Sequence, residues 1–454
     1  MINRYQRLFC VLILFAGAFL ISSRPALGHK KEKPNILLIF VDDLGYGDLG
    51  CYGSTLVPTP NIDKIAATGI KLTDGYASSA TCAPSRLGLM TGRYQQRIGG
   101  YSNTTCKTVD IPKDYMLMPE MLKIEGYKTA HIGKWHINHP VKPVFDKTYN
   151  EINGLSDYFP GSDGKIYGVD GHRKGKRPNG WINESDLPSI TDIHADSAIT
   201  FIEESSRSTD PFFLYLAFNA PHGPWQALVE DQEKFKHISP EVMQIYASMI
   251  QTLDENVGRV MDQLKKSGVA ENTLVVFASD NGPEWGRDYI KGWPANWDPI
   301  IIGSADPLSG RKALFQEGGI RVPFIISWPG KLDAGSVYSH AVTTRDLFET
   351  FGFVAGSNHK YKTDGVNILP FLNGQKKGDP HKILFWRGGA TQPVYARVKD
   401  WKIEVPSDGS EPKLFNLSID IGEKVNVANE NTRLTKEMIK KVRKWEKEIT
   451  SEKR

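Results

Sequence analysis

One cysteine of this chain lies in a sequence that favours the start of a helix. Residues 82–93 read Cys-Ala-Pro-Ser-Arg-Leu-Gly-Leu-Met-Thr-Gly-Arg. Pro84 suits a first helical turn, where its missing N–H would have no partner, and Gly92 is typical of a helix end. A group at a helix N-terminus faces free N–H donors and the positive end of the helix dipole, and Arg86 adds a permanent charge one turn later. The string therefore predicts that Cys82 lies where an anion is held.

Two pairs of oxygen-bearing side chains follow apolar runs. Asp42 and Asp43 come directly after the run 35–41, and Asp280 and Asn281 come directly after 273–279. Removing two adjacent carboxylates from water without a cation would cost several kcal/mol each. Four oxygen ligands with no obvious imidazole partner favour Ca²⁺ or Mg²⁺ over zinc. Each pair is also an ordinary turn sequence, so a structural role remains the alternative for either pair alone.

Four basic side chains form a second set of candidates. Lys134 and His136 follow the apolar run 128–132 and point to the same face if the chain is still extended there. His222 lies in Pro-His-Gly-Pro after the run 211–218, and Lys312 lies in Gly-Arg-Lys. A lone His or Lys is by default structural or solvated. Because ligand sites of open α/β sheets lie beyond the carboxyl ends of the strands, we expect these segments to converge.

The string at 82–93 resembles the signature of the type I sulfatases, a family of the alkaline-phosphatase-like superfamily in which the cysteine is oxidised to formylglycine. The resemblance runs from Asn35 to the Leu-Phe-Asn-Leu segment at 414–417 and is strongest at 35–48, 77–98, 131–136, 279–282 and 310–330. Within the type I family, the chain resembles the bacterial carbohydrate sulfatases. The resemblance implies one Ca²⁺ held by four residues: Asp42, Asp43, Asp280 and Asn281.

The resemblance also implies roles in sulfate-ester hydrolysis. The hydrated aldehyde made from Cys82 would attack sulfur, Asp280 would accept its proton, and a Ca²⁺-stabilised sulfated intermediate would form. His222 with Lys312 would protonate the leaving oxygen, and His136 would help the intermediate collapse. Cations placed where charge develops are usually the largest catalytic contribution. Three are available: Arg86, Lys134 and Lys312. A formylglycine-generating maturation enzyme is the implied partner.

The substrate is less closely defined by the residues. Export and the family favour a sulfated poly- or oligosaccharide. Sulfatases often have a further polar residue on the sulfate after the Lys-x-His motif, and Ser162 is the candidate. Trp285, with Trp293 and Trp297, follows the second oxygen pair and could stack on sugar rings. The sequence does not indicate the sugar, the sulfate position or whether the action is exo or endo.

The remaining patterns predict an α/β fold with a large, mostly parallel sheet flanked by helices. Short buried runs predict parallel strands at 35–41, 128–132, 211–218, 273–279 and 322–328. Helical spacing predicts helices at 61–68, 119–125, 191–205 and 239–268, the last with Ser239 as N-cap and Pro240 at its first position. Segment 154–188 is expected to be a long loop. Strand patterns at 382–386, 394–398, 401–405 and 413–416 predict a smaller antiparallel sheet, closed by a helix from about Thr432 to Lys453. The predicted domains are 29–374, catalytic, and 375–454.

The first 28 residues are typical of a secretory signal. Arg4 and Arg7 precede the apolar run 8–21, and a small-residue site ends at Gly28. We expect export to the periplasm or medium, without a membrane anchor. Removing this segment lowers the formal net charge from +4 to about +1, which gives no bulk attraction to nucleic acid. Cys51 and Cys106 could pair in an oxidising compartment or stay as thiols.

Two other functions compete with the sulfatase. A phosphomonoester or phosphonate ester hydrolase of the same superfamily is the first, although a two-zinc phosphatase would need extra histidines near Asp280, where Asn281 and Gly282 follow instead. A non-catalytic sulfoglycan-binding module is the second. A full set of nucleophile, acid and metal residues argues against it.

Overall fold

The computed structural model describes residues 33–183, 188–286 and 300–451. The chain divides into Met1–Lys33 and a compact unit, Pro34–Arg454, and only Lys33 of the first unit is described. The predicted signal segment and the residues Trp293 and Trp297 lie outside the described residues. Among the helices described, none combines the length and the apolar character that crossing a bilayer requires.

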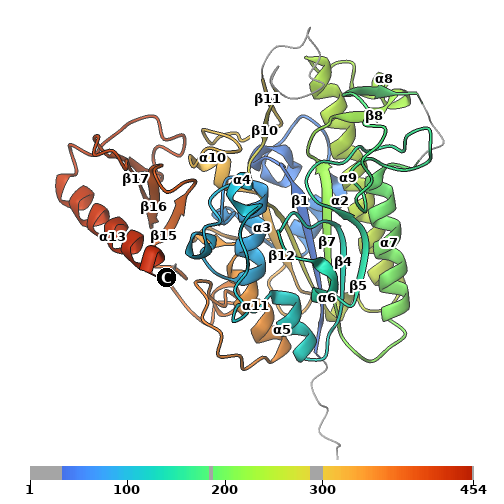
Figure 1. Ribbon diagram of the computed structural model, residues 1–454, viewed down its shortest axis with the longest axis horizontal. Coiled ribbons are helices and arrows are strands. Elements are labelled where there is room, and N and C mark those ends of the chain that lie inside the picture. The colour runs from blue at the N-terminus through green and yellow to red at the C-terminus, as the bar shows by residue number, and fades with distance from the viewer. Residues whose placement is uncertain (1–32, 184–187, 287–299, 452–454) are drawn as a thin grey trace, which may run out of the picture. The chain divides into compact units, whose positions relative to one another are not determined.

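An eight-stranded sheet forms the centre of the second unit, in the order β13-β2-β12-β9-β1-β7-β4-β5 (Figure 1). The five strands from β9 to β5 are mutually parallel, which confirms the mixed, mostly parallel sheet. Every residue of β1, β7 and β9 is buried, as expected for strands covered on both faces. The strands are β1 (Asn35–Asp42), β2 (Ile70–Leu72), β4 (Lys128–Lys134), β5 (Lys147–Ile152), β7 (Phe212–Pro221), β9 (Thr273–Ser279), β12 (Phe324–Ser327) and β13 (Ser336–Tyr338).

The run 322–328 was expected to be parallel, and this prediction is wrong: β12 is antiparallel to both β9 and β2. After β9 the chain returns to the same end of the sheet, where Gly282 N donates to Gly319 O at 3.1 Å and Ser279 N donates to Pro323 O at 3.3 Å. It therefore re-enters the sheet from the carboxyl edge. A buried apolar run specifies burial on both faces but carries no strand direction.

Helices cover both faces of the sheet (Figure 1). Alternate β1 residues determine the two cores. Leu37, Ile39 and Val41 pack with α2 (Pro60–Ala67), α7 (Ile190–Ser205) and α9 (Glu241–Lys266), whereas Ile36, Leu38 and Phe40 pack with α3 (Cys82–Thr91), α5 (Met118–Ile124) and α11 (Asp346–Ala355).

The start of α9 differs from its prediction. Pro240 is the N-cap and Glu241 is the first helical residue, so Ser239 lies outside the helix. The predicted loop 154–188 contains a short strand, β6 (Gly180–Ile182), which pairs in parallel with β8 (Gln226–Leu228). The shorter elements are η1 (Tyr46–Asp48), η2 (Gly50–Tyr52), β3 (Gly75–Tyr76), η3 (Gln95–Ile98), α4 (Asn103–Cys106), α6 (Val141–Val144), η4 (Val229–Asp231), α8 (Gln232–Phe235), η5 (Ala270–Asn272), β10 (Glu284–Gly286), β11 (Ile300–Ile302), α10 (Glu317–Ile320), β14 (Val342–Thr343) and α12 (Leu369–Leu372).

The C-terminal antiparallel sheet is also confirmed. Its order is β15 (Leu384–Arg387), β16 (Val394–Val398), β17 (Trp401–Val405) and β18 (Lys413–Asn416), with consecutive strands antiparallel. The apolar face of α13 (Thr432–Ser451) packs on this sheet through Met438, Val442, Trp445 and Ile449. The division into domains at residue 374 stays a prediction.

Candidate active site

Four strands deliver polar side chains to one buried place at the carboxyl edge of the large sheet. Asp42 ends β1, Lys134 ends β4, and Asp280 follows β9. Asp42 pairs with Pro221 at the end of β7, so His222 comes directly beside it. Each of these four residues is less than a tenth exposed. The convergence follows from the parallel register, because strands that start together also end together.

Helix α3 brings the cysteine to this group. Cys82 is the first residue of α3, and Gly92 ends the helix in a left-handed conformation, as predicted. The Cys82 sulfur lies 3.9 Å from Asp43 Oδ1, and ligand atoms of Asp42, Asp43, Cys82 and His222 all lie within 4.8 Å of one another. The N–H of Ala83 donates to Asn103 Oδ1 at 3.0 Å, so a side chain of α4 caps the start of α3.

Arg86 lies one turn into α3 and is completely buried. Its Nε and one terminal nitrogen reach Asp280 Oδ2 at 3.0 and 2.8 Å, and another terminal nitrogen donates to Lys134 O at 2.9 Å and Tyr215 Oη at 3.2 Å. Arg86 thus fixes α3 against β4, β7 and the segment after β9. A buried guanidinium on several oxygens places a permanent positive charge at a defined point.

The predicted oxygen ligands lie together and fit a hard cation. Asp43 Oδ1 accepts from Asn281 Nδ2 at 2.7 Å, and the Asp43 N–H donates to Asp280 Oδ1 at 3.3 Å. Asp42 Oδ1 and Asn281 Oδ1 are buried and have no hydrogen-bond partner among the described residues. Buried orphaned oxygens are costly, and a bound Ca²⁺ or Mg²⁺ would satisfy them.

Two lysines complete the positive charges of the site. Lys134 Nζ bonds to Asp42 Oδ2. Lys312 Nζ lies between two carboxylates, 2.7 Å from Asp43 Oδ2 and 2.5 Å from Glu284 Oε2. Glu284 was not predicted as a site residue. The site therefore holds four carboxylates and three permanent cations. A bound metal cation would add the positive charge that this count lacks.

Burial and mutual repulsion separate the pKa values of the carboxyl groups. Burial raises the pKa of Asp280 to about 6, with the charge of Asp42 adding to the effect. Burial likewise holds the pKa of Asp43 well above its usual range, although Lys312 opposes this. For Asp42 burial also acts upward, but Lys134, His222 and Arg86 outweigh it and hold the pKa well below the usual range. Burial, followed by the charge of Asp42, raises the pKa of the Cys82 thiol, so it stays protonated.

The two candidate histidines are held by different contacts. His222 Nδ1 lies 2.5 Å from Gly223 O, and Nε2 lies 3.5 Å from Asp43 Oδ2. A proton on Nδ1 therefore faces the carbonyl, and Nε2 points into the site. Burial, with Lys134 and Lys312, lowers the pKa of His222 to about 3.

His136 does not lie in an extended segment. The expectation that Lys134 and His136 point to the same face required an extended backbone, so that condition is not met. β4 ends at Lys134, and His136 has φ +52°. Its N–H donates to Asn153 Oδ1 at 3.2 Å. His136 lines a cavity together with Ala83, the residue next to Cys82. Burial, followed by the charges of Lys134 and Arg86, holds the pKa of His136 well below its usual range.

The two candidates for substrate contact, Ser162 and Trp285, lie in different surroundings. Trp285 is on β10, next to Glu284, and the Arg311 guanidinium lies 3.8 Å from the centroid of its ring. One face of the indole is therefore already covered. Ser162 is exposed in a turn closed by Gly161 and Lys165, and it makes no hydrogen bond to the described residues of the site.

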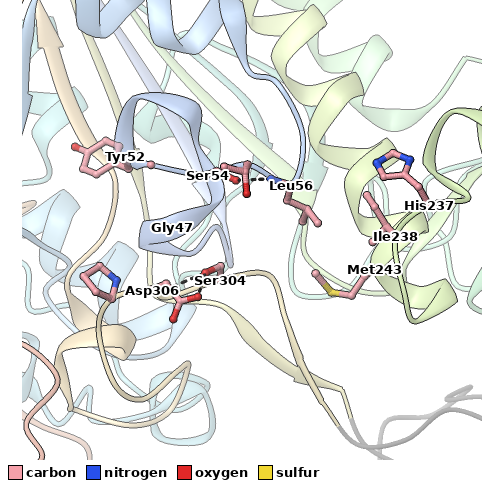
Figure 2. A pocket seen from close by; sticks show the side chains of 12 residues that line it. Gly47, Tyr52, Ser54, Leu56, His237, Ile238, Met243, Ser304 and Asp306 are labelled. Atoms are coloured by element: carbon pink, nitrogen blue, oxygen red, sulfur yellow. Dashed lines mark hydrogen bonds between the residues drawn. The ribbon is translucent and has the colours of Figure 1, made fainter.

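A separate cavity of about 630 Å³ lies away from the predicted residues. Figure 2 shows Tyr52, Ser54 and Leu56 on one side of it, His237, Ile238 and Met243 on another, and Ser304 and Asp306 on a third. None of the predicted site residues lines it, so this opening is not the mouth of the buried group.

Comparison with known proteins decides the family. A family model described as Sulfatase matches residues 34–357, which include Cys82 and all of the predicted metal ligands. The chain belongs to the sulfatase family. As a member of it, the protein is a sulfuric ester hydrolase.

The relatives of this sulfatase include human and bacterial enzymes. The human N-acetylgalactosamine-6-sulfatase is 33% identical over 388 residues, which are 79% of this chain and 69% of that protein. A sulfatase of Formosa agariphila is 28% identical over 518 residues, covering 94% of this chain and 91% of the relative. The crystal structure of Ps i-CgsB is 33% identical, covers 91% of this chain and 93% of its own, and has a TM-score of 0.77. The phosphonate monoester hydrolase of Agrobacterium radiobacter, at 19% identity and a TM-score of 0.68, shows the shared fold alone.

The sequence missed three residues that shape this site: Glu284, Asn103 and Tyr215. Glu284 gave one available signal, since it stands three residues after Asn281, at the start of β10. Asn103 gave none, because a residue that caps a helix from another segment leaves no local pattern. Tyr215 lies within an apolar strand, where its ring looks like core and its hydroxyl bonds to Arg86 only in three dimensions.

Proposed function

We propose that this sulfatase hydrolyses sulfate monoesters on a carbohydrate, with formylglycine made from Cys82 and one bound Ca²⁺. The position of Cys82 carries the proposal. It starts a helix, beside two buried aspartates and a histidine, with Arg86, Lys134 and Lys312 around it. Relatives named for sulfated sugars support the substrate class, among them N-acetylgalactosamine-6-sulfatases and Ps i-CgsB, which has been solved with k-i-k-neocarrahexaose.

The residues of this chain divide the chemical work. The hydrated aldehyde supplies the nucleophile at position 82, and Ca²⁺ held by Asp42, Asp43, Asp280 and Asn281 supplies positive charge for the sulfate oxygens. Asp280 takes the nucleophile's proton. Arg86, Lys134 and Lys312 act on the negative charge that spreads over the sulfuryl group. Their positions are fixed before substrate arrives, so little reorganisation is needed.

The two histidines have separate tasks in this proposal. His222 Nε2 points into the site beside Lys312, and the pair protonates the leaving oxygen of the sugar: the charged Lys312 supplies the proton, and His222 Nε2 accepts it and passes it on. General acid catalysis typically contributes ~10²–10⁴-fold, and more of it is needed for a poor leaving alcohol. His136 assists the return of residue 82 to its resting form with release of sulfate. Trp285 and Ser162 remain candidates for sugar and sulfate contact.

We also propose that the protein is exported and matured. The leader at 1–28 directs it to the periplasm or medium, and a formylglycine-generating enzyme modifies Cys82 on the way. Cell fractionation and sequencing of the mature N-terminus test the first statement. Intact protein retained in the cytoplasm would contradict it.

One experiment tests the function itself. The protein is co-expressed with a maturation enzyme, and the mass of the peptide containing Cys82 is measured by mass spectrometry. Sulfate release is then measured on a panel of substrates. The panel contains carrageenan and glycosaminoglycan oligosaccharides, the matching monosaccharide sulfates, an aryl sulfate and the corresponding aryl phosphate, on which phosphate release is measured. We expect aldehyde at position 82 and no turnover by the Cys82→Ala variant. Full activity from unmodified thiol, or faster phosphate than sulfate release, contradicts the proposal.

The metal has its own test. The purified protein should contain one equivalent of calcium by elemental analysis, and Asp42→Asn should lose it, because the ligand set then offers one fewer charged oxygen. Asp306→Asn, an aspartate outside the group, is the matched control and should keep its calcium. Stoichiometric zinc, with activity only in zinc, would instead favour the phosphoester hydrolase.

A further inference from the structure

Two cavities beside the buried group share part of their walls. The first, of about 630 Å³, is lined by Ala83, next to Cys82, and by His136. The second, of about 760 Å³, is lined by β5 and by the turn at Arg173. Glu151 and Asn153 line both cavities, so the two cavities adjoin at these side chains. We call the pair the β5 groove.

The groove starts beside the buried group, at His136 and Ala83. Lys134 pairs with Ile152 at the carboxyl ends of β4 and β5, and β5 is an edge strand of the sheet (Figure 1). The next residues stay in contact: the His136 N–H donates to Asn153 Oδ1 at 3.2 Å, and Asn153 Nδ2 donates to Glu151 Oε1 at 2.7 Å. A ligand that fills the groove therefore contacts His136, one of the proposed catalytic residues, and Ala83, the neighbour of Cys82.

The far end of the groove has a built wall. The N–H of Glu151 donates to Asp170 Oδ1 at 2.9 Å, and the N–H of Asp170 donates back to Glu151 O at 2.8 Å. This pair fixes the turn that carries Arg173 against β5. The lining extends back along β5 to Thr148, and four residues of a parallel strand span about 13 Å. The groove is thus longer than one sugar ring.

The lining matches a hydroxyl-rich, sparsely charged ligand. Amide side chains supply donors and acceptors together, which suits sugar hydroxyls. Acidic and basic side chains are balanced, so a densely sulfated chain would meet as many carboxylates as cations. The amides are Asn103, Asn138, Asn150 and Asn153; the acids are Asp110, Glu151 and Asp170; and the cations are Lys107, Lys142 and Arg173.

We propose that the β5 groove binds the sugar units adjoining the sulfated ring, so that this enzyme prefers an oligosaccharide to a monosaccharide sulfate. Hydroxyls of the neighbouring units contact the amides, and a single anionic group at the far end contacts Lys142 and Arg173. The inference rests on the proposed carbohydrate sulfatase function, since it names where the rest of that substrate lies.

The test compares two substrates that carry the same sulfated sugar, a hexasaccharide and the monosaccharide sulfate. We expect kcat/KM on the hexasaccharide to be at least about tenfold higher, because the groove adds contacts that the monosaccharide lacks. Arg173→Ala and Lys142→Ala should each lower the hexasaccharide-to-monosaccharide ratio by about two- to tenfold, the range for one lost polar contact. Arg207→Ala, an exposed arginine on another surface, is the control and should keep the wild-type ratio.

Binding to the Cys82→Ala protein supplies a second measurement that needs no turnover. Calorimetry should show tighter binding of the hexasaccharide than of the monosaccharide sulfate, weakened by Arg173→Ala. The groove proposal is overturned if the hexasaccharide and the monosaccharide sulfate give equal kcat/KM and bind equally tightly. In that case sulfate release from either substrate still supports the proposed function. Absence of sulfate release from every substrate, with tight and Arg173-dependent binding of the hexasaccharide, overturns the function and keeps the groove as a sugar site.

Discussion

Glu284 shows how one carboxylate sets the position of a catalytic cation. Lys312 Nζ contacts Asp43 on one side and Glu284 on the other. A lysine is a flexible point charge, and two partners restrict it to one place. Burial acts to raise the pKa of Glu284, but Lys312 and then His222 outweigh it, so the pKa lies below its ordinary value and the side chain stays charged. Glu284 is therefore a positioning residue for the proposed leaving-group step.

Substituting Glu284 should harm that step selectively. In Glu284→Gln the lysine keeps a neutral acceptor, and a charge-assisted hydrogen bond of about 1.5–3 kcal/mol is weakened. We expect kcat/KM to fall about tenfold or more on a sulfated sugar, whose alkoxide leaves poorly. It should fall much less on an aryl sulfate, and His222→Ala should show the same contrast more strongly. Glu430→Gln, on the surface, is the control; equal losses on both substrates would assign Glu284 a purely structural role.

At the residue scale, most of the candidate group could be predicted from the sequence because those residues lie in short local motifs. Cys82 and Arg86 share one string, and Asp42 and Asp280 each directly follow a buried run. Contacts between residues that are distant in the sequence could not be predicted from it. Asn103 caps α3 from another helix, and His136 leaves the extended conformation because β4 ends two residues earlier.

At the element scale, the segment after β9 depends on close backbone packing. Gly282 follows Asn281, and a Cβ built at Gly282 would lie 1.8 Å from Gly318 O. Gly282 N also donates to Gly319 O on α10 at 3.1 Å. The absence of a side chain at 282 thus lets the loop that carries Asp280 and Asn281 rest on α10.

Gly282→Ala should therefore lower stability and disturb the metal ligands together. Overpacking commonly costs about 1–3 kcal/mol, and here the obstacle is backbone, which gives way less easily than a side chain. Denaturant unfolding measures the loss, and calcium content measures the effect on Asn281. Gly161→Ala is a matched control, since its nearest neighbour, Asp163 Oδ1, is 3.5 Å from the added atom. A Gly282→Ala protein with wild-type stability would show that α10 can move aside.

The same scale shows which parts of the fold patterns can predict. The alternation along β1 fixes two apolar faces, and helices on both sides follow from it. The direction of β12 depends on where the chain re-enters the sheet, at Pro323 beside the carboxyl end of β9, and no short pattern records that point. Similarly, the sequence allowed either a disulfide between Cys51 and Cys106 or two free thiols. In the structure both are free thiols.

At the scale of the whole unit, buried ion pairs join the C-terminal sheet to the catalytic part. Lys402 on β17 lies 2.9 Å from Glu317 Oε1 on α10 and 2.9 Å from Glu423 Oε1. Arg397 on β16 reaches Asp74 at 2.5 Å. Removing one partner of such a pair commonly costs about 3–5 kcal/mol, because the other charge stays buried. These partners are far apart in the chain, so composition and spacing gave no sign of them.

Acid titration should expose this connection through Glu317. Burial acts to raise its pKa, but Lys402 and Arg321 outweigh burial and lower the pKa to about 2 from 4.5. The native state therefore keeps Glu317 charged at pH values where the unfolded chain is already protonated. The stabilisation is complete above about pH 4.5 and is lost at about 1.4 kcal/mol per pH unit as the pH falls toward 2.

The free energy of unfolding of Glu317→Gln, measured against wild type between pH 6 and pH 3, tests this sign. The variant cannot take up the proton, so its deficit should be largest near pH 6 and shrink as the pH falls below about 4.5. Glu423→Gln gives the opposite trend, because burial raises the pKa of Glu423 and protonation then favours its native state. A Glu317→Gln deficit that stays constant with pH would mean that the contacts of Glu317 stabilise the join through packing and not through its charge.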